Sequence, residues 1–82
     1  MKYKKSFYNI EVAKLADDRK LVYNAFTGIF GIMDKSTQAL YECIENIETK
    51  DLQDAENIKT IDIMARSGYI IDADKDELAT KN

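Results

Sequence analysis

Apolar and polar residues alternate along the first third of the chain, a pattern typical of half-buried β-strands. The alternation is clearest over residues 8–15, and a second apolar run covers Lys20–Asn24. Residues 16–19 between them predict a turn, because aspartate side chains accept local backbone hydrogen bonds. A tight connection ending at Gly28 leads to a third apolar run, Ile29–Met33. Sequential hairpins of this kind predict a three-stranded antiparallel sheet with the first and third strands at its edges.

The apolar spacing changes to a helical period after Asp34, a residue type that suits the N-cap position. Residues 35–47 form the first predicted helix, and its apolar face consists of Ala39, Leu40, Cys43, Ile44 and Ile47. Cys43 on this face is expected to be a small buried hydrophobe, since free cysteine is among the most buried residue types. Residues 52–67 fit either one helix or a short helix followed by a longer one.

Gly68 follows the second helical segment, at the position where glycine commonly ends a helix. Residues 69–71 predict a last short strand, and residues 72–77 an acidic turn. These elements make an α+β chain, which a winged helix-turn-helix-like layout accommodates: a three-stranded N-terminal antiparallel sheet packed on three helices. The predicted organisation is a basic tail over residues 1–7, one domain over 8–78, and an end, 79–82, that begins a linker.

Charge is unevenly distributed along the 82 residues, although the net charge is only −3. Residues 1–20 carry six basic and three acidic side chains, whereas residues 21–82 carry six basic and twelve acidic ones. The acidic body argues against a nucleic-acid partner, because such partners select a basic face. The basic start is expected to be a solvated end. Neither a membrane-length apolar run nor a signal-peptide pattern occurs, so no membrane partner is predicted.

Residues that carry most enzyme chemistry are scarce. The chain has no histidine and a single cysteine, Cys43, which excludes a histidine general base, a structural zinc site and an internal disulfide. A lone cysteine fits a reducing cytoplasm, the predicted location. Asp72, Asp74 and Asp76 have the spacing that opens a calcium-binding loop, but Glu77 stands where that loop needs glycine. No catalytic or metal-binding residue is therefore predicted.

An ordered series of segments resembles the N-terminal domain of radical SAM/SPASM peptide-maturing enzymes. The segments are Tyr8-Asn-Ile-Glu-Val12, Leu21-Val-Tyr-Asn24, Thr27-Gly28, Met33-Asp34, Gly68-Tyr-Ile-Ile-Asp72 and Asp76-Glu-Leu78. That domain is similar to the RiPP recognition element and to the pyrroloquinoline-quinone peptide chaperones, RiPPs being ribosomally made peptides that are modified after translation. The resemblance covers residues 8–78 and implies a winged-helix fold of three strands and three helices.

The resemblance also implies a function, which is capture of the leader segment of a precursor peptide. The leader would add a strand beside the third strand, in a groove closed by the third helix. On the strand this carries over to Ile29, Phe30, Gly31, Ile32 and Met33. On the helix it carries over to Ile58, Ile61, Asp62 and Ala65. Asp62 would either pair with a basic leader residue or face solvent.

Radical SAM enzymes bind an iron–sulfur cluster through a Cys-x-x-x-Cys-x-x-Cys motif downstream of such a domain, and this motif is absent here. No cofactor is expected in this chain, whereas the full-length enzyme would use S-adenosylmethionine and iron–sulfur clusters. The catalytic domain would act in cis or in trans, so the chain is either an excised N-terminal domain or a stand-alone recognition protein. A native-looking Met1 and an abrupt acidic end favour excision.

The leading hypothesis is a non-catalytic peptide-binding module that presents a precursor to a radical SAM maturase. From the residues alone, a core-facing strand is the more usual explanation of Ile29–Met33, because short apolar runs usually belong to the core. A separate alternative is a structural subdomain that packs against its own enzyme and never contacts the leader. A winged-helix DNA-binding regulator is a further alternative, although Lys59 and Arg66 are the only basic residues between 52 and 67. Whether a free sheet edge pairs two copies into an edge-strand dimer is left open.

Overall fold

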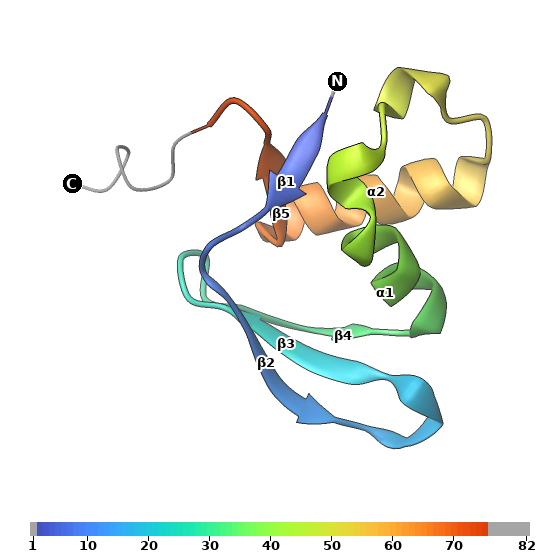
Figure 1. Ribbon diagram of the computed structural model, residues 1–82. Coiled ribbons are helices and arrows are strands. Elements are labelled where there is room, and N and C mark those ends of the chain that lie inside the picture. Colours follow the sequence, from blue (N-terminus) through green and yellow to red (C-terminus); the bar gives the residue numbers. More distant parts are fainter. Residues whose placement is uncertain (1, 76–82) are drawn as a thin grey trace.

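A three-stranded antiparallel sheet and two α-helices dominate the computed structural model, which describes residues 2–75 (Figure 1). The elements are β1 (Tyr3–Lys5), β2 (Asn9–Lys14), β3 (Lys20–Asn24), β4 (Ile29–Met33), α1 (Lys35–Glu42), α2 (Ala55–Ser67) and β5 (Ile70–Asp72). Short 3-10 turns cover Ala16–Asp18, Ile44–Asn46 and Thr49–Asp51. Figure 1 shows α1, α2 and the β1–β5 pair on one side of the sheet. The predicted α+β class is confirmed, with two α-helices in the described residues where three helices were expected.

The sheet has the strand order β2-β3-β4, with both pairings antiparallel. The β2–β3 register runs from Asn9 opposite Asn24 to Lys14 opposite Lys20, and a bulge interrupts it between Glu11 and Ala13. β3 and β4 pair without interruption. The predicted three-stranded sheet is therefore confirmed, and β2 and β4 are its edges.

The N-terminal segment is a strand rather than a solvated tail. β1 pairs antiparallel with β5, which brings Tyr3 opposite Asp72 and Lys5 opposite Ile70. Tyr3 packs against the buried core, and Lys5 lies over the Tyr41 ring with its Nζ 5.2 Å from the centroid. The expectation of a solvated N-terminal end is wrong. That expectation was based on the lysines of this segment, whereas the strand that pairs with it, β5, lies at the far end of the chain. Residues of the predicted tail thus belong to the fold.

The first helix begins as predicted and ends early. The carboxylate of Asp34 accepts a 2.8 Å hydrogen bond from the backbone N–H of Thr37, which confirms the N-cap and lowers the pKa of Asp34. The helix ends at Glu42 instead of residue 47, because Cys43 leaves helical geometry at φ −105°, ψ 12°. Ile44 then enters the core, while Cys43 is exposed. The prediction of a buried Cys43 is therefore wrong.

The second helix occupies the later part of its predicted segment. It begins at Ala55, after Asp54, whose side chain accepts a hydrogen bond from the Glu56 N–H. Gly68 caps its other end at φ 88°, a left-handed conformation that glycine adopts without strain, so the predicted stop is confirmed. Residues 73–75 follow β5 as a turn, whereas residues 76–82, with the predicted linker start at 79–82, lie outside the described part.

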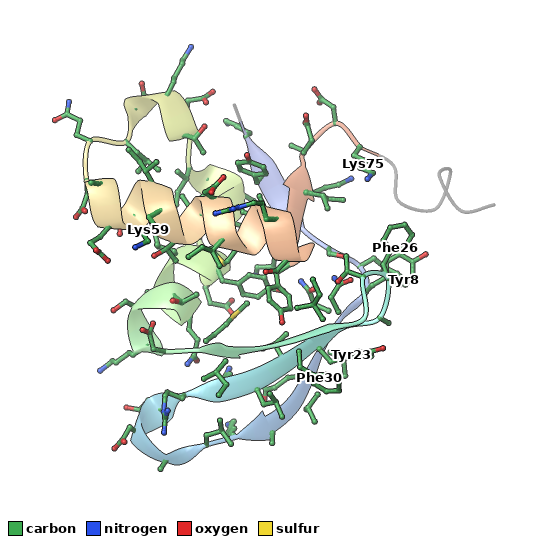
Figure 2. All side chains as sticks on the ribbon, turned by 180° about the vertical axis from the view of Figure 1, so that it is seen from behind. Tyr8, Tyr23, Phe26, Phe30, Lys59 and Lys75 are labelled. Atoms are coloured by element: carbon green, nitrogen blue, oxygen red, sulfur yellow. The ribbon has the colours of Figure 1, made fainter. Side chains whose placement is uncertain are left out.

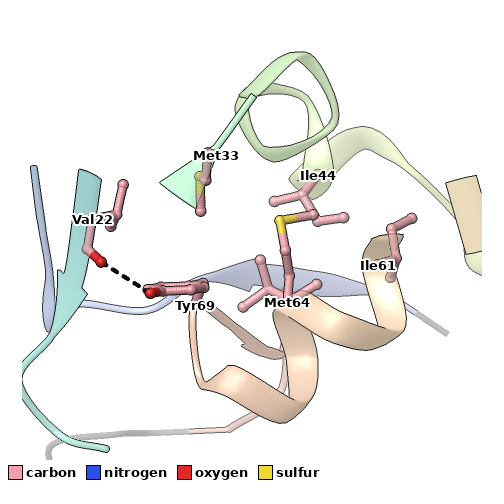
Figure 3. Close-up of a cluster of buried hydrophobic side chains, with 7 residues drawn as sticks. Val22, Met33, Ile44, Ile61, Met64 and Tyr69 are labelled. Atoms are coloured by element: carbon pink, nitrogen blue, oxygen red, sulfur yellow. Dashed lines mark hydrogen bonds between the residues drawn. The ribbon is translucent and has the colours of Figure 1, made fainter. Parts of the chain in front are cut away.

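The hydrophobic core lies mainly between α2, β5 and the Ile44 turn, and the sheet contributes little to it. Figure 3 shows most of its members, and Met64 and Tyr69 lie at the centre of the view. From the sheet, only Val22 and Met33 are buried hydrophobics. The remaining buried hydrophobic residues are Ile44, Ile61, Met64, Tyr69 and Ile70. β4 and α2 are thus held together by a small number of side chains.

Asn24 is a fully buried polar residue that joins four parts of the fold. Its Nδ2 donates to Asn9 Oδ1 at 2.8 Å and to the Gly68 carbonyl at 3.0 Å. Its Oδ1 accepts from the N–H groups of Phe26 and Thr27 at 3.0 and 2.9 Å. These bonds connect β2, β3, the β3–β4 turn and the end of α2. Every buried side-chain nitrogen or oxygen among the described residues has a partner.

Replacing Asn24 by alanine is expected to lower the free energy of unfolding by about 2–3 kcal/mol, because several buried backbone and side-chain groups lose their partner. Urea denaturation followed by circular dichroism measures this difference. Asn46→Ala is the matched control, since Asn46 is exposed and should change stability by less than about 0.5 kcal/mol. An Asn24→Ala protein as stable as the Asn46→Ala protein would contradict the assigned role.

Candidate peptide-binding groove

β4 is paired on one side only. It contacts β3 from Asn24 opposite Ile29 to Lys20 opposite Met33, and no further strand among residues 2–75 pairs with it. In an antiparallel pair, successive residues direct their N–H and C=O groups alternately toward and away from the partner strand. Part of the β4 backbone therefore offers hydrogen-bonding groups at the open edge, and these can pair with an extended chain.

The two edges of the sheet differ in how well they are protected. β2 carries Glu11 and Lys14 and contains the bulge, and charges and bulges are the devices by which natural sheets prevent pairing at an edge. β4 reads Ile-Phe-Gly-Ile-Met, without a charge or proline, and its ladder has no bulge. β4 is therefore the edge at which another strand can be accepted.

A groove of about 250 Å³ runs between the open edge of β4 and α2. We call it the β4 groove. All five residues of β4 line it, and the other lining residues are Thr37, Thr60, Ile63, Met64, Ser67 and Tyr69. None of these side chains is charged. The groove thus combines apolar walls with four hydroxyl groups, those of Thr37, Thr60, Ser67 and Tyr69, a surface that suits an extended peptide with apolar side chains.

The Tyr69 side chain packs against β4. Its side chain is 4% exposed, and its Oη donates to the carbonyl of Val22 at 2.9 Å, with the carbonyl of Ile29 at 3.3 Å (Figure 3). Burial raises the pKa of this phenol, which keeps it protonated and able to donate at neutral pH. The ring passes so close to Gly31 that a Cβ there would lie 2.6 Å from Oη. The glycine that the sequence places inside the strand therefore permits a close approach.

The predicted strand residues have different environments. Phe30 and Ile32 are 62% and 57% exposed and lie in register with Tyr23 and Leu21, on the side of the sheet away from the helices, while Ile29 is partly exposed. Met33 is buried in the core, so for this residue the core-facing interpretation is right. β4 thus contributes Met33 to the core and exposes the apolar side chains of Phe30 and Ile32.

The helix residues predicted for the site do not line the β4 groove. Ile58, Ile61 and Asp62 line a second hollow of about 320 Å³, which Tyr3, Thr49, Lys50 and Leu52 complete. Ala65 is partly buried against the core. Asp62 forms an ion pair with Arg66 at 2.7 Å on the exposed helix surface. The four residues therefore occupy a different face of α2 from the one that borders β4.

Sequence reasoning missed the helix residues that do border β4, namely Thr60, Ile63, Met64 and Ser67. Their spacing is helical and places them on one face. Ile63 is 48% exposed and lies outside the buried stripe that contains Ile61 and Met64. The sequence signal that could have found this face was Ile63, an apolar residue that lies beside the regular apolar stripe of the helix and not within it.

Other kinds of site find little support among residues 2–75. Within this part of the chain, no three histidine, cysteine or acidic side chains come together to hold a metal ion. Nor does this part contain a helix with the length and apolar character needed to cross a membrane. No protein-family model, curated protein or solved structure matches the chain. The functional argument therefore depends on the geometry of β4 and α2.

Gly31→Ala is expected to lower the free energy of unfolding by about 1–3 kcal/mol, because the new methyl group clashes with a buried, hydrogen-bonded ring. Tyr69→Phe removes the closest atom and leaves the ring carbons 3.2 and 3.3 Å from that methyl group. The double variant should therefore be more stable than the sum of the two losses implies, by about 1 kcal/mol. Chemical denaturation of the four proteins measures this coupling, and strictly additive losses would contradict the contact.

Proposed function

We propose that this chain is a non-catalytic peptide-binding module that captures the leader segment of a ribosomal precursor peptide by β-strand addition. The observation that carries the proposal is the contrast between the two sheet edges: β2 is blocked by charge and a bulge, while β4 is open and apolar. The leader would continue the sheet beyond β4 and place alternate side chains in the β4 groove. The proposed occupant is an extended, largely apolar peptide segment.

The expected affinity follows from the size of this interface. About five to seven paired residues form about four main-chain hydrogen bonds, each worth about 0.5–1.5 kcal/mol. Each apolar peptide side chain that is fully buried in the groove adds about 1.5–3 kcal/mol. Association costs offset a large part of this sum, so a dissociation constant in the micromolar range is expected.

The resemblance to RiPP recognition elements supports the same role and supplies its context. It implies the winged-helix arrangement and a radical SAM maturase as partner, joined to this domain or acting on the bound precursor in trans. Tethering the leader would raise the local concentration of the modifiable part of the precursor near the catalytic domain. S-adenosylmethionine and the iron–sulfur clusters would belong to that catalytic domain, because one exposed cysteine, Cys43, does not fit a cluster.

Nucleic-acid binding is disfavoured by the charges of α2. Of its two basic residues, Arg66 is already paired with Asp62, and Glu56 lies in its first turn. A helix with this balance lacks the positive face that phosphate contacts require. A role as a packing subdomain of the maturase remains the alternative that the following experiment separates.

Overlapping synthetic peptides that tile the precursor encoded beside the gene are the probe, titrated into the isotope-labelled chain. NMR shift changes are expected at Ile29–Met33 and along residues 60–67. Ile63→Asp should weaken binding at least about tenfold, because a carboxylate in the apolar groove loses its hydration. Ile58→Asp is the matched control on the same helix, with 46% exposure against 48% for Ile63, and should leave the affinity unchanged.

Two results would overturn the proposal. If no peptide changes any amide shift at high micromolar concentration, the chain is a packing subdomain. If Ile58→Asp weakens binding and Ile63→Asp does not, the ligand occupies the second hollow, beside Leu52, instead of the β4 groove.

A further inference from the structure

The three-stranded sheet carries apolar residues on both of its sides. The helix-facing side has the buried Val22 and Met33 beside the polar Asn9, Glu11, Lys20 and Asn24. The opposite side, which we call the outer face, consists of Ile10, Ala13, Leu21, Tyr23, Phe30 and Ile32, with Val12 beside them at the bulge. An antiparallel sheet with one solvated side normally directs polar residues to the water on that side. The outer face therefore has the composition of a covered surface.

The outer face is a continuous apolar layer across all three strands. Ile10, Tyr23 and Phe30 lie opposite one another in the register, and Leu21 lies opposite Ile32. The Tyr23 and Phe30 rings are in contact, with centroids 4.4 Å apart. Figure 2 shows this ring pair on the side of the sheet that faces away from the helices. No element among residues 2–75 covers this layer.

The exposed area is close to what a dimer needs. Ile10, Val12, Phe30 and Ile32 are 48–62% exposed, which amounts to about 400 Å² if a fully exposed large apolar side chain offers roughly 200 Å². Apolar area makes up roughly 60% of a protein–protein interface, so a contact centred on this face would bury about 700 Å² per copy. Standard-size interfaces bury roughly 800 Å² per partner.

We propose that the outer face is a dimer interface and that its occupant is a second copy of this chain, packed sheet against sheet. The residues of the outer face carry no charge, since Glu11, Lys14 and Lys20 of these strands lie on the other side, so two copies meet there without the like-charge repulsion expected elsewhere for a chain of net charge −3. Two such faces related by a two-fold axis pack on each other as in a β-sandwich. This arrangement leaves the backbone edge of β4 free, and it therefore stands whether or not the β4 groove binds a peptide.

Sedimentation equilibrium of the full chain tests the proposal, from about 10 µM to about 1 mM. The apparent mass should rise from 9.4 kDa toward twice that value with concentration. Ile10→Lys places a charge on β2 opposite Tyr23, at the edge of the sheet remote from β4, and should weaken the dimer at least about tenfold. Ile58→Lys is the matched control. Ile58 lies on α2 and is 46% exposed, against 50% for Ile10, and this substitution should leave the strength of the dimer unchanged. Circular dichroism checks that both variants are folded.

A chain that remains at the monomer mass up to about 1 mM would overturn the proposal and leave the face to a different protein. A dimer that Ile10→Lys does not weaken, or that Ile58→Lys weakens equally, would also overturn it. If Ile10→Lys does not weaken the dimer, the two copies pair through the β4 edge or another surface.

Discussion

The contact between the Tyr69 ring and β4 is the constraint on which the candidate site depends. Tyr69 lies between the end of α2 and the first residue of β5, and its hydroxyl reaches the backbone of both β3 and β4. Because Gly31 has no side chain, the ring can support the edge strand directly. This contact joins β4 to the segment that follows α2, at the side of the β4 groove that Tyr69 lines. Asn24 fixes the same region from the turn side, through its bond to the Gly68 carbonyl.

A small fold with a core of few residues has to divide its apolar side chains among stability, binding and solubility. Here the core is concentrated around α2 and β5, and the sheet gives it only Val22 and Met33. The other apolar residues of the sheet stand at the open edge or on the outer face. The described residues therefore leave several large apolar side chains exposed, among them Phe30, Ile32 and Ile63.

Local signals in the sequence were sufficient for the main elements. The alternation over β2, the N-cap Asp34 and the stop at Gly68 each depend on residues close in sequence, and the structure confirms them. Long-range effects were not predictable. β1 forms because β5 is available to pair with it, and Cys43 leaves the core because Ile44 fills it more fully. The five strand residues of the candidate site were found from an apolar run, but the helix face was not, since which face of α2 borders β4 depends on how the helix is seated on Tyr69 and Ile70.

The central claim is that β4 accepts an added strand, and cross-strand NMR contacts test it most directly. In a complex of the labelled chain with a bound leader peptide, the account predicts nuclear Overhauser effects between the peptide backbone and the backbone of Ile29–Met33, at the alternate positions that strand pairing produces. Side-chain contacts should join the same peptide residues to Ile63. Contacts confined to Ile58 and Leu52, or to the outer face at Ile10 and Val12, with none to the β4 backbone, would contradict the account.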